Sequence, residues 1–329
     1  MRGLQQGGAL PHAQPFMARY QPHFIEARRR PLAITGALAV FVAGLIGAFR
    51  YIDNFRLYRG YPAPRDPAFV RSRGKLQTIY VSSALLGGRR QRVLVYLPPG
   101  YVNSQRRYPV MYLLHGSPGT PEQFLNIVRA GILVDELVAR RAPPLILVMP
   151  FGATGAFGDT EWLNGVRPHS SWETFVAQDV VRAIDDRYRT VPHGRGRAIA
   201  GLSEGGYGAI NIALHHPGEF RVVESWSGYV RAAPNRRLFG QDAARVRYNS
   251  PLFRLPFVAA ALRRAQTFFW FYSGRSDPLR AENAAFAASL ARAHIGHHFF
   301  TVAGRHDWRL WRNNAAASIA VAERHLAGR

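Results

Sequence analysis

Short apolar runs of strand length alternate with amphipathic stretches of helix length along most of this chain. Glycine and proline separate many of these segments, as they do at turns. The strand-like runs cover residues 78–85, 92–97, 108–114, 145–149, 197–200, 221–226, 267–272 and 297–302, and helical patterns cover about 122–140, 172–188 and 206–215. From residue 108 onward strands and helices alternate, which is typical of a mostly parallel sheet with helices on both faces.

The first two strands are predicted to pair differently. Gly87 and Gly88 lie between the runs at 78–85 and 92–97. Two glycines between two strands are a signature of a β-hairpin, so these strands are predicted to be antiparallel. The expected fold class is α/β, with an N-terminal antiparallel hairpin on a mostly parallel sheet.

An apolar segment near the amino terminus differs from the rest of the chain. Residues 32–49 contain no charged side chain, follow Arg28, Arg29 and Arg30 and precede Arg50. As a helix, these eighteen residues would extend about 27 Å, close to the ~30 Å hydrocarbon core of a bilayer. We expect a single transmembrane helix, because flanking charges fit a membrane span better than a buried core helix. The alternative of a cleaved signal peptide usually has a shorter charged start.

Arginines flank this segment on both sides, so the charge bias that sets membrane orientation is small. Within about fifteen residues, the flanking arginines are Arg19, Arg28, Arg29 and Arg30 before it and Arg50, Arg56 and Arg59 after it. We expect a single-pass protein of the cell membrane, with the amino terminus inside and the large carboxyl-terminal domain extracytoplasmic.

The segments on either side of the expected membrane helix lack regular patterns. Residues 1–31 are rich in Gln, Pro, Gly and Arg and are predicted to be disordered. Residues 50–75 contain three prolines between 62 and 67 and are predicted to form a linker. Residues 76–329 form the predicted main domain, which is long enough for one large core and contains the chemical signals described next.

The composition is strongly basic, with a formal net charge of +23 at pH 7. All but one of the 43 Lys and Arg residues are arginine, which favours compositional bias, although the charge also suits an anionic lipid or envelope surface. Nucleic-acid binding is not expected, because no recognised motif is present. The absence of cysteine excludes disulfides, thiol catalysis and thiolate metal sites, and it fits an exported protein.

Residues 201–205, Gly-Leu-Ser-Glu-Gly, carry the first chemical signal. They lie between the apolar run 197–200 and the helical run 206–215. This context is that of a nucleophile elbow, in which a sharp turn between a strand and a helix exposes a serine hydroxyl. Ordinary glycine-rich turns share the G-x-S-x-G sequence, so the assignment of Ser203 as nucleophile depends on residues further along the chain.

The two partners that a serine nucleophile needs follow later strands. Asp277 and His306 each come after a predicted strand, in the order Ser, acid, His that this fold uses. Because the carboxyl ends of parallel strands meet at one edge of a sheet, we expect the three side chains to converge there. Glu282 or Asp307 could supply the acid instead, but Glu282 falls inside the helix expected next.

The oxyanion that forms during acyl transfer needs backbone N–H donors. One donor is assigned to Glu204, directly after Ser203. The second is assigned to Ser117, in a loop after an earlier strand, because the next residue, Pro118, has no N–H. A plain turn is the alternative interpretation of this loop.

The regular pattern breaks down between residues 228 and 266. An insertion before the acid-bearing strand could form a cap over the pocket. Its aromatic residues could then line an acyl site, or could simply pack this segment onto the domain; they are Tyr229, Phe239, Tyr248, Phe253 and Phe257.

Several stretches resemble one enzyme family. The loop 115–119, the elbow 201–205, the run 272–274 leading to Asp277, and His306-Asp307-Trp308 with Trp311 are similar to the putative esterase (esterase D-like) family of α/β-hydrolases. That family includes feruloyl esterases, S-formylglutathione hydrolases and antigen 85-type mycolyltransferases, and stretches 160–162 and 172–175 are most similar to the mycolyltransferase branch. The resemblance covers about residues 76–326. It implies an α/β-hydrolase fold, a serine hydrolase or acyltransferase, and no metal or organic cofactor.

The resemblance also suggests residues of the substrate pocket. Trp162 and Trp308 neighbour the matched stretches. His115 belongs to the oxyanion loop, where we expect it to shape the loop rather than take part in the chemistry. The expected ligand is a small-molecule or lipid ester.

Two departures favour an esterase over a mycolyltransferase. Mycolyltransferases have an acidic residue and an arginine in the oxyanion loop and a glutamate as the acid, whereas this chain has His-Gly-Ser-Pro-Gly and Asp277. We therefore expect a membrane-anchored serine esterase that forms an acyl-enzyme. The alternatives are acyl transfer to a cell-envelope sugar and a non-catalytic scaffold, although a scaffold has no need of a triad.

Overall fold

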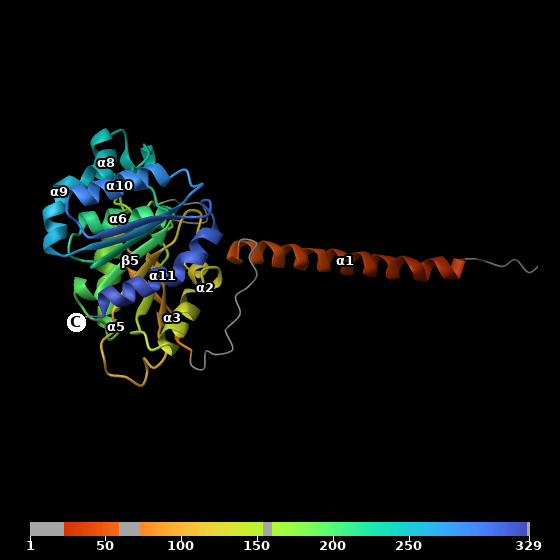
Figure 1. Cartoon of the computed structure of the whole chain (residues 1–329). Helices are drawn as coiled ribbons and strands as arrows, with labels where there is room; N and C mark the ends of the chain where they lie inside the picture. The colour runs from red at the N-terminus through yellow and green to blue at the C-terminus, as the bar shows by residue number, and fades with distance from the viewer. Residues whose placement is uncertain (1–22, 59–72, 154–159, 328–329) are drawn as a thin grey trace, which may run out of the picture. The chain divides into compact units, whose positions relative to one another are not determined.

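The computed structural model describes residues 23–58, 73–153 and 160–327 (Figure 1). By its internal contacts the chain divides into two compact units, Met1–Asn54 and Phe55–Arg329. The larger unit contains every predicted catalytic residue.

The larger unit is built around one eight-stranded sheet with the order β1-β2-β4-β3-β5-β6-β7-β8. The strands are β1 (Lys75–Ser82), β2 (Arg90–Leu97), β3 (Val110–Leu114), β4 (Ile146–Pro150), β5 (Arg197–Leu202), β6 (Val222–Trp226), β7 (Phe268–Gly274) and β8 (His297–Val302). β2 pairs antiparallel with β1 and β4, and all other neighbouring strands are parallel. The predicted α/β class, with an antiparallel hairpin before a parallel sheet, is confirmed.

The first two strands form a hairpin, but β1 ends three residues before the predicted end at residue 85. The Ser83 side chain accepts a hydrogen bond from the Leu85 N–H and so caps a short 3-10 helix, η1 (Ala84–Leu86). Gly87 and Gly88 follow with φ of 70° and 75°, which glycine adopts without steric strain. The strands are therefore joined by a helical loop rather than by a two-residue turn.

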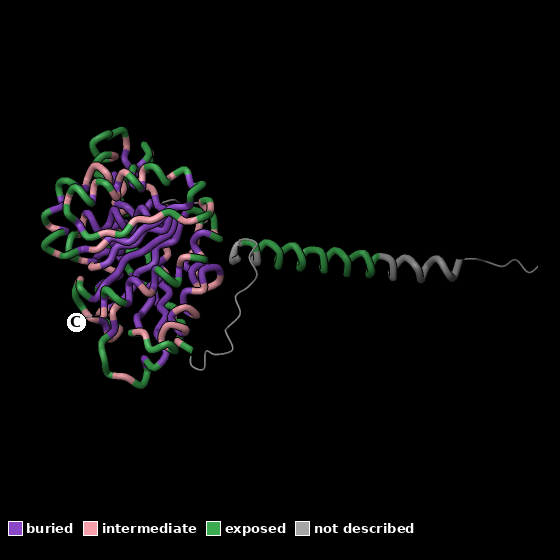
Figure 2. Tube along the Cα trace, viewed as in Figure 1, coloured by how far each residue is buried: buried purple, intermediate pink, exposed green. Residues whose placement is uncertain are grey.

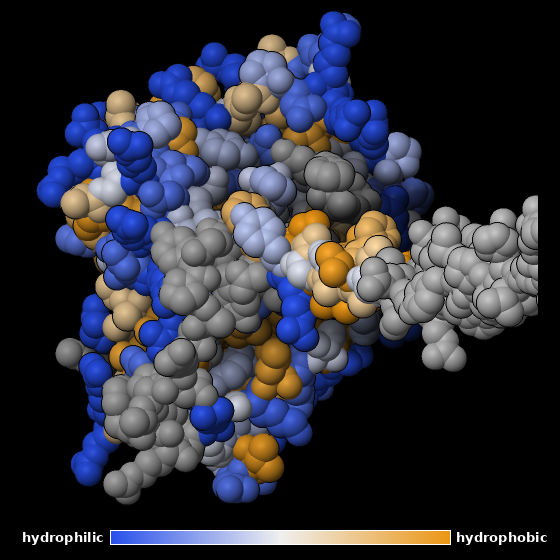
Figure 3. Space-filling model, turned by 90° about the vertical axis from the view of Figure 1, so that its right-hand side faces the viewer, coloured by the Kyte–Doolittle hydropathy of each residue, from blue (hydrophilic) through white to orange (hydrophobic). Residues whose placement is uncertain are grey.

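Helices cover both faces of the sheet (Figure 1). One face carries α2 (Glu122–Asn126), α3 (Ala130–Ala139) and α11 (Trp308–Leu326), and the other carries α5 (Val181–Arg187), α6 (Glu204–His215), α9 (Pro251–Arg264) and α10 (Arg280–Arg292). Each set packs on its own cluster of apolar side chains, so the sheet separates two cores. Figure 2 shows the buried central strands, and Figure 3 shows one face on which hydrophilic residues, in blue, predominate.

Two predicted helices are interrupted. The helix expected over about 122–140 is divided into α2 and α3, because Arg129 between them has a left-handed φ of 67°. The helix expected over 172–188 consists of α4 (Trp172–Thr174), a π-helical segment (Phe175–Val180) and α5. The irregular region 228–266 contains α7 (Arg236–Phe239), α8 (Ala243–Tyr248) and α9.

The amino-terminal helix α1 (His23–Tyr58) contains one stretch, Ile34–Ile52, that is long and apolar enough to cross a membrane. None of this stretch is buried, which does not fit a soluble core helix. Residues 23–31 and 50–58, for which the sequence predicts disorder and a linker, belong to the helix; the arginines in both segments have a favourable helix propensity. Residues 1–22 and 59–72, in the same two predicted segments, lie outside the described residues.

Candidate active site

Ser203 lies in a sharp turn between β5, which ends at Leu202, and α6, which begins at Glu204. Its backbone has φ 54° and ψ −121°, a strained conformation for a residue with a side chain. The flanking glycines allow this turn, because a Cβ on Gly201 would lie 2.2 Å from the Gly205 carbonyl oxygen, and one on Gly205 would lie 1.9 Å from the Leu114 carbonyl oxygen. The turn has the geometry of a nucleophile elbow.

The structure brings Ser203, His306 and Asp277 together at one edge of the sheet. His306 Nε2 lies 2.8 Å from Ser203 Oγ, and His306 Nδ1 lies 2.9 Å from Asp277 Oδ2. Asp277 follows β7 and His306 follows β8, so each side chain lies just beyond the carboxyl end of a parallel strand. With Nδ1 donating to the carboxylate, Nε2 is left to accept the serine proton.

The Asp277 carboxylate is held by two further hydrogen bonds. The Ser227 hydroxyl donates to Oδ2, and the Leu279 N–H donates to Oδ1 at 2.9 Å. Burial alone would raise the pKa of Asp277, but the hydrogen bonds from His306, Ser227 and Leu279 outweigh it and lower the pKa below its ordinary value. Asp277 is therefore charged at neutral pH. Sequence reasoning missed Ser227, whose signal is its position directly after β6.

The two alternative acids have other contacts. Glu282 lies in the first turn of α10, where its side chain accepts a hydrogen bond from the Val230 N–H. Asp307 caps α11 by accepting hydrogen bonds from the N–H groups of Arg309 and Leu310. Among the described carboxylates, Asp277 is the one hydrogen-bonded to His306.

A pocket of about 210 Å³ lies beside Ser203. Its lining residues come from the loop after β3, α2, the elbow, the loop that carries His306 and the start of α11: Gly116, Ser117, Pro118, Gln123, Leu202, Ser203, His306, Trp308 and Trp311. Trp308, one of the residues suggested for the substrate pocket, therefore lines this pocket. The Trp311 ring also contacts the edge of the His306 ring, with centroids 5.1 Å apart, and so supports the position of the imidazole.

His115 and Trp162, for which the sequence suggests a place in the substrate pocket, do not line the pocket beside Ser203. The Trp162 side chain is fully buried and its Nε1–H donates to the His115 carbonyl oxygen at 3.0 Å. His115 Nε2 accepts from the Gly152 N–H at 3.1 Å, so Nδ1 carries the proton and donates to the Gly116 carbonyl. Burial lowers the pKa of His115 to about 4, and the neutral ring stabilises the loop from beneath.

The two predicted oxyanion donors belong to segments that lie next to the nucleophile. Glu204 is the first residue of α6, and Ser117 lines the pocket from the loop after β3. This loop passes close to the elbow, because a Cβ placed on Gly116 would lie 3.2 Å from the Ser203 Cβ.

The region 228–266 contributes none of the residues that line this pocket. Phe239 is buried in a small cluster with Leu163 and Tyr207, whereas Phe257 is 81% exposed on α9. Phe239 thus packs the region onto the domain, Phe257 faces solvent, and none of the five predicted aromatic residues lines this pocket.

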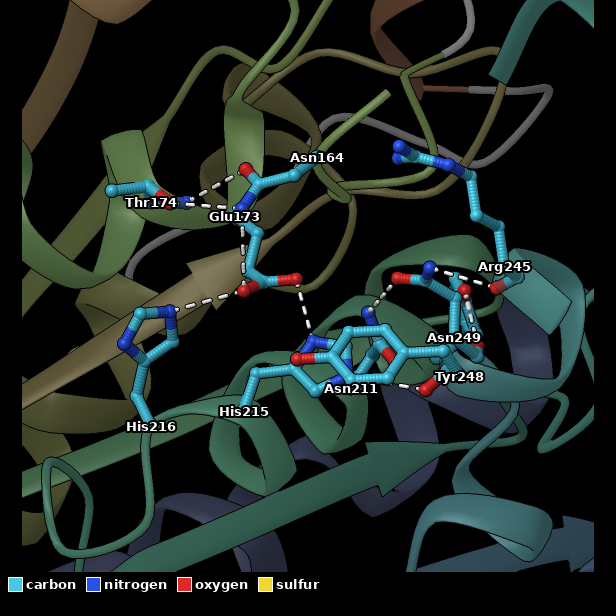
Figure 4. A network of polar contacts seen from close by, with 10 residues as sticks. Asn164, Glu173, Thr174, Asn211, His215, His216, Arg245, Tyr248 and Asn249 are labelled. Carbon is cyan, nitrogen blue, oxygen red and sulfur yellow. Dashed lines mark hydrogen bonds and ion pairs between the residues drawn. The ribbon is translucent and has the colours of Figure 1, made fainter. Parts of the chain in front are cut away.

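A second buried carboxylate, Glu173, lies in a separate polar network (Figure 4). Its oxygens contact His215 Nδ1 at 2.6 Å and His216 Nε2 at 3.1 Å, at the carboxyl end of α6. Burial would raise the pKa of Glu173, but these hydrogen bonds outweigh burial and lower it. These contacts link α4, which carries Glu173, to the carboxyl end of α6. Within the described ranges, no three His, Asp or Glu side chains are grouped as metal ligands.

Comparison with known proteins extends these observations. Residues 82–320 match the family model described as "Putative esterase". "Esterase Rv1288" of Mycobacterium tuberculosis H37Rv is 31% identical over 252 aligned positions, and the match covers 66% of this chain and 52% of that protein. "MPT51 antigen" of Mycobacterium leprae is 26% identical over 222 aligned positions, and the match covers 58% of this chain and 71% of that protein. The chain spans about half the length of the first of these relatives.

Solved structures share the same architecture. A ferulic acid esterase superposes with a TM-score of 0.67 at 26% identity, covering 77% of this chain and 99% of its own. FphF, a fluorophosphonate-binding serine hydrolase of Staphylococcus aureus, superposes with a TM-score of 0.65 at 19% identity, covering 76% and 99%. M. tuberculosis MPT51 superposes with a TM-score of 0.58 at 19% identity, covering 75% and 98%. The predicted α/β-hydrolase fold is confirmed.

Proposed function

Because this chain belongs to the Putative esterase family of α/β-hydrolases, we propose that Ser203, His306 and Asp277 cleave carboxylic esters through an acyl-enzyme intermediate. The chain is a serine hydrolase that acts on carboxylic esters. The observation that carries the assignment of residues is the 2.8 Å contact between Ser203 Oγ and His306 Nε2.

In the first half of the reaction, Ser203 Oγ attacks the ester carbonyl while His306 Nε2 accepts the hydroxyl proton. The negative charge of Asp277 stabilises the imidazolium that results. The N–H groups of Ser117 and Glu204 donate to the oxyanion. His306 then gives its proton to the departing alcohol, which leaves an acyl group on Ser203.

In the second half, a water molecule gives a proton to His306 and attacks the acyl carbonyl carbon. The tetrahedral intermediate that forms then collapses and releases the carboxylic acid, and His306 returns the proton to Ser203 Oγ. A sugar hydroxyl could replace water at this step, which would make the enzyme an acyltransferase. Assays with and without a sugar acceptor distinguish hydrolysis from acyl transfer.

The test is fluorophosphonate labelling of the purified full chain. We expect the wild type to be labelled and Ser203→Ala not to be labelled. A Ser276→Ala control, at an exposed position in the loop that carries Asp277, should be labelled like the wild type. A panel of nitrophenyl esters of rising acyl length, with and without a sugar acceptor, would define the acyl group and distinguish hydrolysis from transfer. Labelling that persists in Ser203→Ala would refute the nucleophile assignment.

The stretch Ile34–Ile52 supports a second element of the proposal, a single-pass membrane anchor with an extracytoplasmic catalytic domain. Its length and apolar composition suit a bilayer, and its residues are not buried in the fold. After an alkaline carbonate wash, the full chain should remain in the membrane fraction. Protease added outside intact spheroplasts should remove the catalytic domain; release of a soluble, shortened chain would instead indicate a cleaved signal sequence.

A further inference from the structure

A second pocket, of about 370 Å³, lies at the edge of the sheet opposite Ser203. Its lining includes His193 and three arginines, Arg195, Arg221 and Arg264. Arg195 and Arg221 come just before β5 and β6, whereas Ser203 follows β5. Six residues of β-strand extend about 20 Å, so this pocket is separate from the active site.

The three arginines of this pocket come from separate segments and lack acidic partners. Arg195 lies in a 3-10 turn (Gly194–Gly196), Arg221 precedes β6, and Arg264 is the last residue of α9. Within the described ranges, no carboxylate lies within ion-pair distance of any of them. The neighbouring Arg197, in contrast, pairs with both Asp185 and Glu219. Asp185 and Glu219 are thus already paired with Arg197, and the lining of the pocket keeps an excess of positive charge.

Arg221 holds a fixed position in this pocket. Its guanidinium donates to the Ala265 carbonyl at 3.3 Å and to the Gln266 side-chain oxygen at 3.1 Å. Burial, and next the charge of Arg195, lower the pKa of Arg221. Two like charges therefore lie near one another, and the backbone carbonyls after α9 offset them only in part. A bound anion would remove this repulsion.

We propose that this pocket binds a phosphate-class oxyanion. Guanidinium groups present paired N–H donors in a plane that matches two phosphate oxygens, and they stay charged under all physiological conditions. Three such groups suit a dianion better than a single carboxylate. The phosphate could belong to a soluble organic phosphate or to a lipid headgroup, and both would present the same chemistry to the three arginines.

The experiment uses inorganic phosphate with the purified full chain, at constant ionic strength set with chloride. Thermal unfolding and ³¹P NMR line width would be followed as phosphate is added. The test variant is Arg195→Gln/Arg264→Gln, which leaves Arg221 and its contacts unchanged. The control is Arg236→Gln/Arg237→Gln, which removes the same charge from exposed positions on α7.

We expect a saturable rise in Tm and line broadening in the wild type and the control, and at least a tenfold weaker Kd in the test variant. Phosphate also stabilises proteins without binding a site. An equal, non-saturating rise in all three proteins would therefore overturn the proposal. Ester hydrolysis should be the same in all three, because the pocket is remote from Ser203.

Two further ligands would distinguish the sources of the phosphate. Glycerol phosphate represents the soluble source, and a short-chain phosphatidylglycerol in neutral micelles represents the lipid source. Arginine-dependent binding of either ligand supports the site, and the tighter of the two identifies the source. The proposal would be overturned if the Arg195→Gln/Arg264→Gln variant bound both ligands as tightly as the wild type does.

Discussion

The Ser227 hydroxyl and His306 Nδ1 donate to the same oxygen, Oδ2 of Asp277. The carboxylate is thus fixed by a residue that does not line the pocket. Since the direction of the Asp277 oxygens sets the direction of the imidazole, Ser227 acts as a positioning residue. It reaches the reaction only through Asp277.

Replacement of Ser227 by alanine should lower kcat about 10- to 100-fold, the effect of losing a hydrogen bond to a charged group. KM should change little, because Ser227 does not line the substrate pocket. Steady-state kinetics with a nitrophenyl ester would measure both constants. Ser227 has a φ of 58°, and alanine keeps the Cβ of serine, so Ser227→Ala removes the hydroxyl without adding backbone strain. A wild-type kcat in Ser227→Ala would show that this hydroxyl does not position Asp277.

Replacement of Trp308 by alanine should shift the preferred acyl chain to longer esters. The indole lines a pocket of only about 210 Å³, and its removal would leave room for additional methylene groups. The kcat/KM values for nitrophenyl esters of rising length would measure the shift. Phe257→Ala, on an exposed site outside the pocket, should keep the wild-type preference. The same preference in both variants would exclude Trp308 from acyl selection.

Replacement of Gly205 by alanine should destabilise the protein by about 3 kcal/mol or more, because the new methyl group would overlap the Leu114 carbonyl. Chemical denaturation would give the free energy of unfolding. Gly296→Ala is the matched control, since its added Cβ would lie 3.5 Å from the Phe268 ring, an ordinary contact. Similar losses in the two variants would contradict the crowding described at the elbow.

Replacement of Glu224 by glutamine should flatten the dependence of stability on pH. Burial raises the pKa of Glu224 to about 8 in the folded protein, although Ser318 and Trp226 donate hydrogen bonds to it. In the unfolded chain the group loses its proton near pH 4.3. Between these values the folded state holds one more proton, so stability falls as pH rises, by up to about 1.4 kcal/mol per pH unit.

Denaturant unfolding of wild type and Glu224→Gln at several pH values from 5 to 8 would measure this difference. The raised pKa of Glu323 acts in the same direction and stays in both proteins, so the slope should decrease rather than vanish. Parallel stability curves for the two proteins would mean that Glu224 is ionised in the folded state.

Replacement of Glu173 by glutamine should cost about 1–3 kcal/mol of stability at neutral pH, because the two histidines would lose a buried anionic partner. The lowered pKa of Glu173 means that its contribution is present above its unfolded pKa and is lost as pH falls through the folded value. The wild type and Glu173→Gln should therefore converge in stability at acid pH. A constant difference from pH 7 to pH 3, followed by circular dichroism, would rule out this charge effect.

The sheet and the three triad residues could be predicted from the sequence for a simple reason. Parallel strands put their carboxyl ends at one edge, so the order of Ser203, Asp277 and His306 along the chain already implies that they meet. The apolar runs gave most strands to within one or two residues. Burial on both faces makes such runs long and easy to recognise.

The remaining features depend on contacts between distant segments, which spacing does not show. The proximity of Trp162 to matched motifs suggested a pocket residue, but its indole donates a hydrogen bond beneath the oxyanion loop. Arg129 is itself neither proline nor glycine, so its identity does not predict the break between α2 and α3. The break is evident only from the positive φ of Arg129. Ser227 could have been considered, because it too follows a strand at the catalytic edge.

The proposed base, His306, comes directly before Asp307, whose side chain caps α11. In the nascent chain, Ser203 is therefore made about a hundred residues before the imidazole that activates it. The hydroxyl gains its partner only once α11 has packed on the sheet and fixed the segment that carries His306. Appearance of esterase activity during refolding should thus report the docking of α11.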